Sequence, residues 1–155
     1  MLRFRILLAC TLAMAALSAA TPAAKAAPVP RSVAISHTMV AELNYARSRH
    51  GLPALQPSRL LRISAGAFSR YIVRRDYFGH AASIHASSRF RRLGEVLEIH
   101  YRRGYRFRGT VNAWLNSPSH RAVLLSPRWR YVGAGQTTGR VGRGRATVWV
   151  AHFGA

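Results

Sequence analysis

Apolar side chains in the first half of the chain recur at helical spacing. A run between residues 32 and 50 repeats every three or four positions, which places its apolar members on one face of an α-helix. Gly51 follows this run and is typical of a helix end. A second stripe begins after Ser58, a residue type that favours the N-cap position. The pattern therefore predicts two amphipathic helices, with these apolar positions: Ile35, Met39, Leu43 and Ala46, then Leu61, Ala65, Phe68 and Ile72.

Three shorter helices are predicted farther along the chain. One spans Ser87 to Leu93, and a second begins at Thr110 as its cap and carries Trp114 on its apolar side. We expect Trp114 to be a core residue rather than a surface for ligand stacking. The third has Pro118 in its first turn, where proline is tolerated, and continues to Leu125.

The period of the pattern changes to that of β-strands near the end of the chain. Residues 146–153 alternate and are rich in β-branched and aromatic side chains, and 131–136 is a second strand candidate with small residues. A glycine-rich hairpin loop over 138–144 is predicted between them, and 96–100 is a third strand candidate. Helices followed by mainly antiparallel strands favour an α+β domain with helices packed on a small sheet.

The first part of the chain has the pattern of an export signal. Arg3 and Arg5 precede an apolar run from Ile6 to Ala20, which is too short to span a bilayer comfortably, and small residues follow it. We expect a secretory signal peptide over 1–26, a linker over 27–31 and one domain over 32–155. The protein is then periplasmic or extracellular, and its mature chain has no transmembrane segment.

Cysteine is almost absent. Cys10 is the only cysteine and lies within the expected signal peptide, so cleavage after it leaves no disulfide and no cysteine nucleophile. The sequence from Leu7 to Cys10 has the form of a lipidation signal, but the apolar run continues to Leu17. The cleavage site and lipidation of Cys10 are left open.

The charge is strongly one-sided. The chain has 24 Lys+Arg against 4 Asp+Glu, a formal net charge of +20, and a surface of this kind attracts polyanions. Arginines alternate with aromatic residues between Tyr101 and Arg108, a pattern that can hold phosphates and stack on rings. In an exported protein lipopolysaccharide and other anionic envelope polymers are the expected partners, and nucleic acid is not; the alternative is a solvated loop. The candidate polyanion-binding residues are Arg102, Arg103, Arg106 and Arg108.

Two histidines and one glutamate stand out as candidates for chemistry. His80, Glu95 and His120 each follow a glycine or proline break, where functional side chains often lie. Two histidines and a carboxylate can hold zinc and leave its fourth coordination position open. The alternative to a zinc site is a buried His–Glu hydrogen-bond network, and the residues by themselves favour this network. His37 and His50 are expected at the surface, while His152 alternates with valines and is expected to face the core.

Several blocks, in order along the chain, carry a family resemblance. These blocks are Leu43-Asn44-Tyr45-Ala46-Arg47 with Gly51-Leu52-Pro53-Ala54-Leu55, Phe78-Gly79-His80, Gly94-Glu95, Trp114-Leu115-Asn116-Ser117-Pro118-Ser119-His120-Arg121 and Tyr131-Val132-Gly133-Ala134-Gly135. In this order they resemble the CAP superfamily (cysteine-rich secretory proteins, antigen 5 and pathogenesis-related group 1 proteins, the SCP domain), closest to its bacterial secreted branch.

The resemblance implies a three-layer α-β-α sandwich with a cleft in which some members bind zinc or another divalent ion. It places His80, Glu95 and His120 on three of four cleft positions as metal ligands. The fourth is Ser117 here, and Val96 stands where the family usually has asparagine, so two departures weaken the transfer of metal binding. Glu98 could supply a second carboxylate to the cleft, but it is expected to pair with surface arginines.

Three functional hypotheses remain. The leading one is a secreted CAP-domain protein that binds a small ligand or lipid, or a divalent metal such as zinc, in its cleft. Catalysis is left open, with no demonstrable catalytic activity as the expectation. The second is a zinc-dependent hydrolase that uses the same cleft. The third is a cationic envelope protein that binds polyanions through its arginines.

Overall fold

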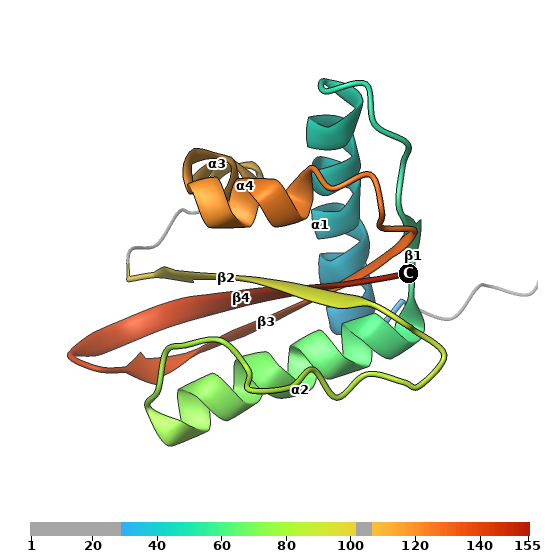
Figure 1. The fold of residues 1–155 in the computed structure, drawn as a ribbon. Coiled ribbons are helices and arrows are strands. Elements are labelled where there is room, and N and C mark those ends of the chain that lie inside the picture. The colour runs from blue at the N-terminus through green and yellow to red at the C-terminus, as the bar shows by residue number, and fades with distance from the viewer. Residues whose placement is uncertain (1–28, 102–106) are drawn as a thin grey trace, which may run out of the picture.

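The computed structural model describes residues 29–101 and 107–155. Helices and strands alternate only loosely along the chain, and the longest strands lie at its end (Figure 1). In chain order the elements are α1 (Arg31–Ser48), β1 (Gln56–Pro57), α2 (Arg59–Arg75), β2 (Leu93–His100), α3 (Phe107–Asn116), α4 (Pro118–Leu124), β3 (Tyr131–Val141) and β4 (Gly144–Gly154).

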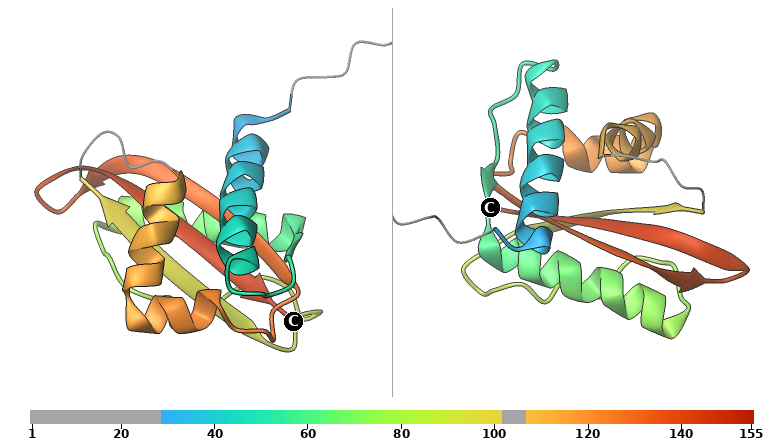
Figure 2. Two further views of the ribbon diagram at one scale, coloured as in Figure 1. Left: turned by 90° about the horizontal axis from the view of Figure 1, so that it is seen from above. Right: turned by 180° about the vertical axis from the view of Figure 1, so that it is seen from behind.

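The strands form one mixed sheet in the order β1-β3-β4-β2. The β3–β4 and β2–β4 pairs are antiparallel, and the short β1 pairs in parallel with the first residues of β3. Helix α2 lies along one face of this sheet, while α1, α3 and α4 lie on the other face (Figures 1 and 2). The predicted α+β class and three-layer arrangement are confirmed.

Each face of the sheet has its own apolar core. Trp114 is completely buried in the core under α1, α3 and α4, and its indole Nε1–H donates to the carbonyl of Leu97 at 2.9 Å. On the α2 side, Ala65 and Ile72 pack against Val148 and Val150 of β4. The prediction that Trp114 is a core residue is confirmed.

Small residues bring α2 very close to β3. A Cβ at Gly135 would overlap the backbone nitrogen of Gly66, and one at Gly133 would overlap the backbone of Arg62. Ser58 starts the helix as predicted, because its Oγ accepts the N–H of Leu61 at 3.4 Å. The contact therefore needs glycines at positions 133 and 135 of the strand.

Two predicted helix features are wrong. No helix forms over Ser87–Leu93: a turn occupies 88–89 and β2 begins at Leu93. The N–H groups of Arg91 and Arg92 both donate to the carbonyl of Ala155, so pairing with the chain end competes with helix formation there. Helix α3 begins at Phe107, so Thr110 is a buried residue within it rather than its cap.

The prediction of a long hairpin loop over 138–144 is also wrong. β3 continues to Val141 and β4 starts at Gly144, which leaves a two-residue turn at Gly142 and Arg143. Gly142 has φ +55, a conformation that favours glycine in such turns. In the described ranges no helix is long and apolar enough to cross a membrane.

Candidate functional site

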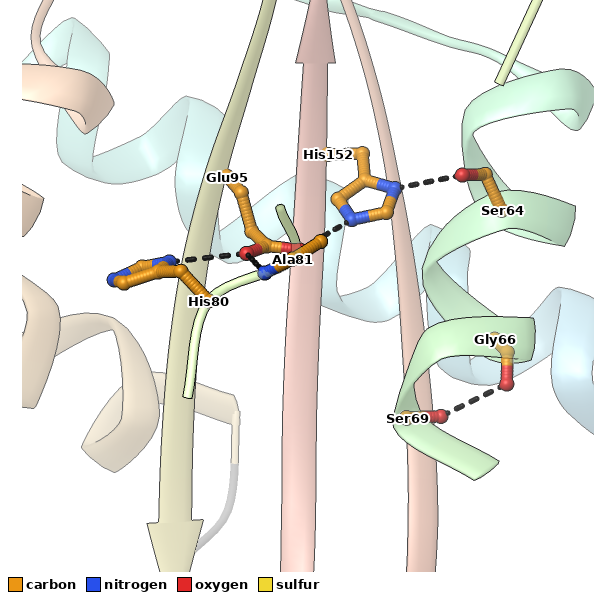
Figure 3. Close-up of polar contacts among 7 residues, drawn as sticks. All are labelled: Ser64, Gly66, Ser69, His80, Ala81, Glu95 and His152. Atoms are coloured by element: carbon orange, nitrogen blue, oxygen red, sulfur yellow. Dashed lines mark hydrogen bonds and ion pairs between the residues drawn. The ribbon is translucent and has the colours of Figure 1, made fainter. Parts of the chain in front are cut away.

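A buried carboxylate lies at the centre of the site. The Glu95 side chain on β2 is only 5% exposed, and each of its oxygens has partners (Figure 3). Oε1 accepts the backbone N–H of Ala81 at 3.0 Å and lies 3.0 Å from Nδ1 of His80, while Oε2 lies 2.8 Å from Nε2 of His152. Glu95 thus joins two histidines from different parts of the chain.

The register of the sheet places these groups together. Glu95 of β2 pairs directly with His152 of β4, so the two side chains project from the same face. Nδ1 of His152 lies 3.0 Å from Oγ of Ser64 on α2, the helix that covers this face. A polar chain therefore runs from Ser64 through His152 and Glu95 to His80, which lies in the segment after α2 (Figure 3).

Hydrogen bonding keeps Glu95 ionised. Burial alone would raise the pKa of its carboxyl, but hydrogen bonds from His152, from the Ala81 N–H and from His80 outweigh it and hold the pKa below the usual value. A carboxylate only accepts hydrogen bonds, so both histidines donate to it. In its neutral form His80 then keeps an unprotonated Nε2, the nitrogen that is free to bind something else.

His80 and His120 lie close together, as the family resemblance at both positions implies. Their ring centroids are 5.8 Å apart in an edge-to-face arrangement. His120 comes from α4, and its Nδ1 is buried without a hydrogen-bond partner among the described residues. Burial, and secondly the nearby His80, lower the pKa of His120, which favours its neutral form near pH 7.

The arrangement offers two histidines, rather than two histidines and a carboxylate, as possible ligands of a divalent ion. Both Glu95 oxygens are already hydrogen-bonded, and in the described ranges no group of three or more His, Cys, Asp or Glu side chains is placed to hold a metal. Glu95 instead stands behind His80, in the position of the carboxylates that orient metal-binding histidines. His80 and His120 are the two side chains that could hold an ion here.

Two adjoining pockets lie beside this polar chain, between α2 and the segment that follows it. One has a volume of about 270 Å³ and is bordered by Ser64 and His152, and the other is about 460 Å³ and is bordered by His80 and Tyr77. We call the two together the histidine groove. Its shared wall is mainly aromatic and also carries the polar pair Ser83 and His85, whose side chains lie 3.0 Å apart. The residues common to both pockets are Phe68, Tyr71, Ala81, Ser83 and His85.

The sequence does not identify His152 and Ser64 as members of this site. The pattern along the chain predicts only that His152 faces the core, and this is confirmed, because His152 is 1% exposed. Its partners Glu95 and Ser64 are set by strand register and helix packing. Alternation along β4 indicates the burial but cannot name the partner. The His–Glu hydrogen-bond network, the alternative to a metal triad, is present, with His152 as its unexpected second histidine.

The arginine-rich segment is described only at its end. Arg102, Arg103 and Arg106 lie outside the described residues, so their predicted role in polyanion binding stays a prediction. Arg108 forms an ion pair with Glu42 at 3.3 Å and lies over the ring of Tyr45.

Three other sequence expectations have clear outcomes. His37 and His50 are exposed, as predicted. Glu98 makes no ion pair with an arginine in the described part of the chain, contrary to expectation; its carboxylate accepts the N–H of Ile99, and burial raises its pKa.

Comparison with known proteins gives consistent matches. The model of the CAP, or cysteine-rich secretory protein, family matches residues 40–153. The uncharacterized protein YkwD of Bacillus subtilis (strain 168) is 27% identical over 135 residues, covering 80% of this chain and 49% of that protein. The chain thus spans about half the length of this relative.

Solved structures share the fold at low identity. An outer surface protein of Borrelia burgdorferi is 21% identical with a TM-score of 0.61, covering 76% of this chain and 90% of that one. An extracellular protein with an SCP domain from Bacillus anthracis is 21% identical with a TM-score of 0.56, and the match covers 83% of this chain and 45% of that one. Venom allergen-like protein 4 of Schistosoma mansoni is 12% identical with a TM-score of 0.62, and the match covers 81% of this chain and 89% of that one. The family match extends over most of the chain and agrees with the fold and the residue blocks, and this chain belongs to the CAP family.

Proposed function

We propose that this protein is an exported binding protein that holds a small, largely apolar ligand in the histidine groove. The observation that carries the proposal is the position of the aromatic pockets directly beside the Ser64–His152–Glu95–His80 chain. Apolar walls with a few convergent polar groups are the usual form of a small-molecule site. The volumes, about 270 and 460 Å³, suit a small molecule.

The polar chain defines what the ligand presents to the groove. Glu95 holds Nδ1 of His80, so the unprotonated Nε2 accepts a hydrogen bond from a hydroxyl or amide of the ligand. The rings of Phe68 and Tyr71, whose centroids are 5.9 Å apart in a stacked arrangement, would contact its apolar body. A ligand with one hydrogen-bond donor on an apolar skeleton fits this combination.

Divalent metal binding is a second candidate. It is supported by the buried Nδ1 of His120, which lies beside His80 and has no hydrogen-bond partner within residues 29–101 and 107–155. His80 and His120 would hold the ion, and Glu95 would orient His80. A bound zinc ion would supply a Lewis acid that polarises a ligand oxygen. A zinc-dependent hydrolase has less support, because the hydrogen-bonded oxygens of Glu95 offer neither a third ligand nor a free base.

Export is part of the proposal. It rests on the signal-like pattern of residues 1–26 and agrees with the names of two similar structures, an outer surface protein and an extracellular protein. Binding of anionic envelope polymers through the arginine-rich segment remains a further expectation for a protein in that location.

Filling the groove tests the ligand proposal. Ala67 is exposed and borders the pocket at His152, so Ala67→Trp should block it, while Ala34→Trp on α1 adds the same side chain away from it. With N-phenyl-1-naphthylamine as an uncharged fluorescent probe, we expect the first variant to lose about tenfold or more in affinity and the second to bind as wild type. Equal binding by both variants would refute the groove as the ligand site.

Calorimetric titration with zinc tests the metal candidate separately. We expect His80→Gln or His120→Gln to remove most binding at pH 7.5, and His37→Gln to change little. Because protons compete with the ion for the histidine nitrogens, wild-type zinc affinity should be lower at pH 5.5 than at pH 7.5. Zinc affinity that is flat over this range, or that survives loss of both histidines, would place the metal elsewhere.

A further inference from the structure

A second groove lies on the opposite flank of α2. Its volume is about 710 Å³, and it shares no bordering residue with the histidine groove. Helix α1, helix α2 and strand β3 form its walls, and β4 contributes one residue. We call it the arginine groove because four arginines border it: Arg31, Arg62, Arg70 and Arg145.

The fold brings these arginines together from distant parts of the sequence. Close packing of α2 against Gly133 of β3 places Arg62 beside the strand. Arg70 lies one helical turn after Gly66 on the same side of α2. Its Nη1 is 3.5 Å from the position that a Cβ of Gly66 would occupy, so the guanidinium lies over Gly66. Arg31 is the first residue of α1, and Arg145 is the second residue of β4.

No acidic side chain in the described part of the chain pairs with the arginines of this groove. The chain has only 4 acidic residues, and Glu42 pairs with Arg108 while Glu95 binds two histidines. The other two accept backbone N–H groups, Asp76 that of Gly142 and Glu98 that of Ile99. Within the described ranges, none of the four pairs with an arginine of the groove, so these cations repel one another until an external anion binds.

The edge of β3 adds neutral donors to the same groove. β1 pairs with β3 only as far as Val132, whose carbonyl accepts the N–H of Ser58 across this edge. Alternate residues of a strand direct their backbone groups to the same edge, so Gln136 and Thr138, which border the groove, present N–H groups toward it. Among the strands of the described sheet none covers this part of β3.

We propose that the arginine groove is a binding site for an anion with several phosphate groups. Guanidinium forks match phosphate oxygens in pairs, and backbone N–H groups donate to further oxygens without adding charge. The same chemistry is presented by a soluble polyphosphate and by phosphorylated lipid headgroups, and the apolar Ile35 and Ile63 at the groove would contact the non-charged part of either. This site is separate from the histidine groove and does not depend on its ligand.

The test compares two variants that lose equal charge. One carries Arg31→Gln, Arg62→Gln, Arg70→Gln and Arg145→Gln, and the control replaces four exposed arginines outside the groove with glutamine: Arg91, Arg92, Arg128 and Arg143. The measurement is calorimetric titration with tripolyphosphate at about 0.15 M salt, where long-range attraction is screened. We expect the groove variant to bind tripolyphosphate with an affinity about tenfold or more below that of the control. Equal losses would show that net charge alone binds the anion and would overturn the proposal.

A smaller variant guards against misfolding. Arg70→Gln with Arg145→Gln removes only exposed side chains, and we expect it to lower tripolyphosphate affinity several-fold while its unfolding temperature stays that of the wild type. A variant with Arg102, Arg103, Arg106 and Arg108 replaced should bind like the control. If the loss were confined to that variant, the binding site would be the arginine-rich segment and not the groove.

Two further probes identify the source of the phosphates. Sedimentation with vesicles that contain an anionic phospholipid, reversed by tripolyphosphate, would assign the site to headgroups. Tripolyphosphate binding without vesicle binding would assign it to soluble polyphosphate, and both results support the proposal. Tighter binding of a hexaglutamate peptide than of tripolyphosphate, lost in the groove variant, would overturn it in favour of an acidic peptide along the β3 edge.

Discussion

Nε2 of His152 lies 2.8 Å from Oε2 of Glu95, although 57 residues separate them in the chain. The contact exists because β2 and β4 are paired in the register that sets the two residues opposite each other. It turns a buried glutamate, which would be costly alone, into the shared acceptor of three hydrogen bonds. Glu95 is therefore a structural and a positioning residue of the site.

Loss of this carboxylate should make stability less dependent on pH. The folded-state pKa of Glu95 is depressed, so its contribution is present above the unfolded value of about 4.3 and is lost as the pH falls through the lower folded value. We expect Glu95→Gln to reduce the free energy of unfolding by about 2 kcal/mol at pH 7, and the difference from wild type to shrink below about pH 4. Urea denaturation between pH 7 and 3 measures both.

Glu42→Gln is the matched control, because it removes an ion pair with the exposed Arg108. Its effect should stay within about 1 kcal/mol. A difference between wild type and Glu95→Gln that stays constant down to pH 3 would contradict the assignment.

Replacement of Arg47 by lysine should be strongly destabilising. Arg47 is fully buried in α1, where its guanidinium donates to the carbonyls of Pro53, Leu124 and Ser126 at 3.1, 2.7 and 3.0 Å. A single ammonium group cannot reach all three in the same geometry, so Arg47→Lys should cost about 2–4 kcal/mol in chemical denaturation. Arg49→Lys, at the exposed C-cap position just after the same helix, should change the unfolding free energy by no more than about 0.5 kcal/mol.

A methyl group at Gly135 should push α2 away from the sheet. Its Cβ would overlap the backbone of Gly66, which is less able to yield than a side chain. We expect Gly135→Ala to lower the unfolding free energy by about 1–3 kcal/mol. Gly144→Ala is the comparison, since its Cβ would make an ordinary 3.5 Å contact with the ring of Tyr101, and a similar loss in both variants would argue against the close packing.

Two substitutions of Trp114 separate packing from hydrogen bonding. Trp114→Ala should cost about 3–5 kcal/mol, because it removes a fully buried ring. Trp114→Phe keeps most of the ring but leaves the carbonyl of Leu97 without its donor, and should cost about 1–3 kcal/mol. Thermal stability unchanged in the alanine variant would refute the core assignment.

The sequence by itself determined the class of fold and most of its elements. Helical spacing identified α1 and α2, and a proline in the first turn identified α4. Alternation identified most of β4, and the strand candidates over 131–136 and 96–100 lie within β3 and β2. These signals are local, because each depends on residues within a few positions of one another. The residue blocks around His80, Glu95 and His120 also led to the CAP family, which the family match confirms.

Tertiary structure alone decided the ends of the strands and the partners in the site. Residues 87–92 do not form the predicted helix, because the backbone there pairs with Ala155. The hairpin turn has only two residues because continued pairing with the neighbouring strand satisfies backbone groups that a long loop would leave to water. The contact of Glu95 with His152, and the gathering of four arginines along α2 and β3, depend on register and helix packing, which arise between segments far apart in the chain.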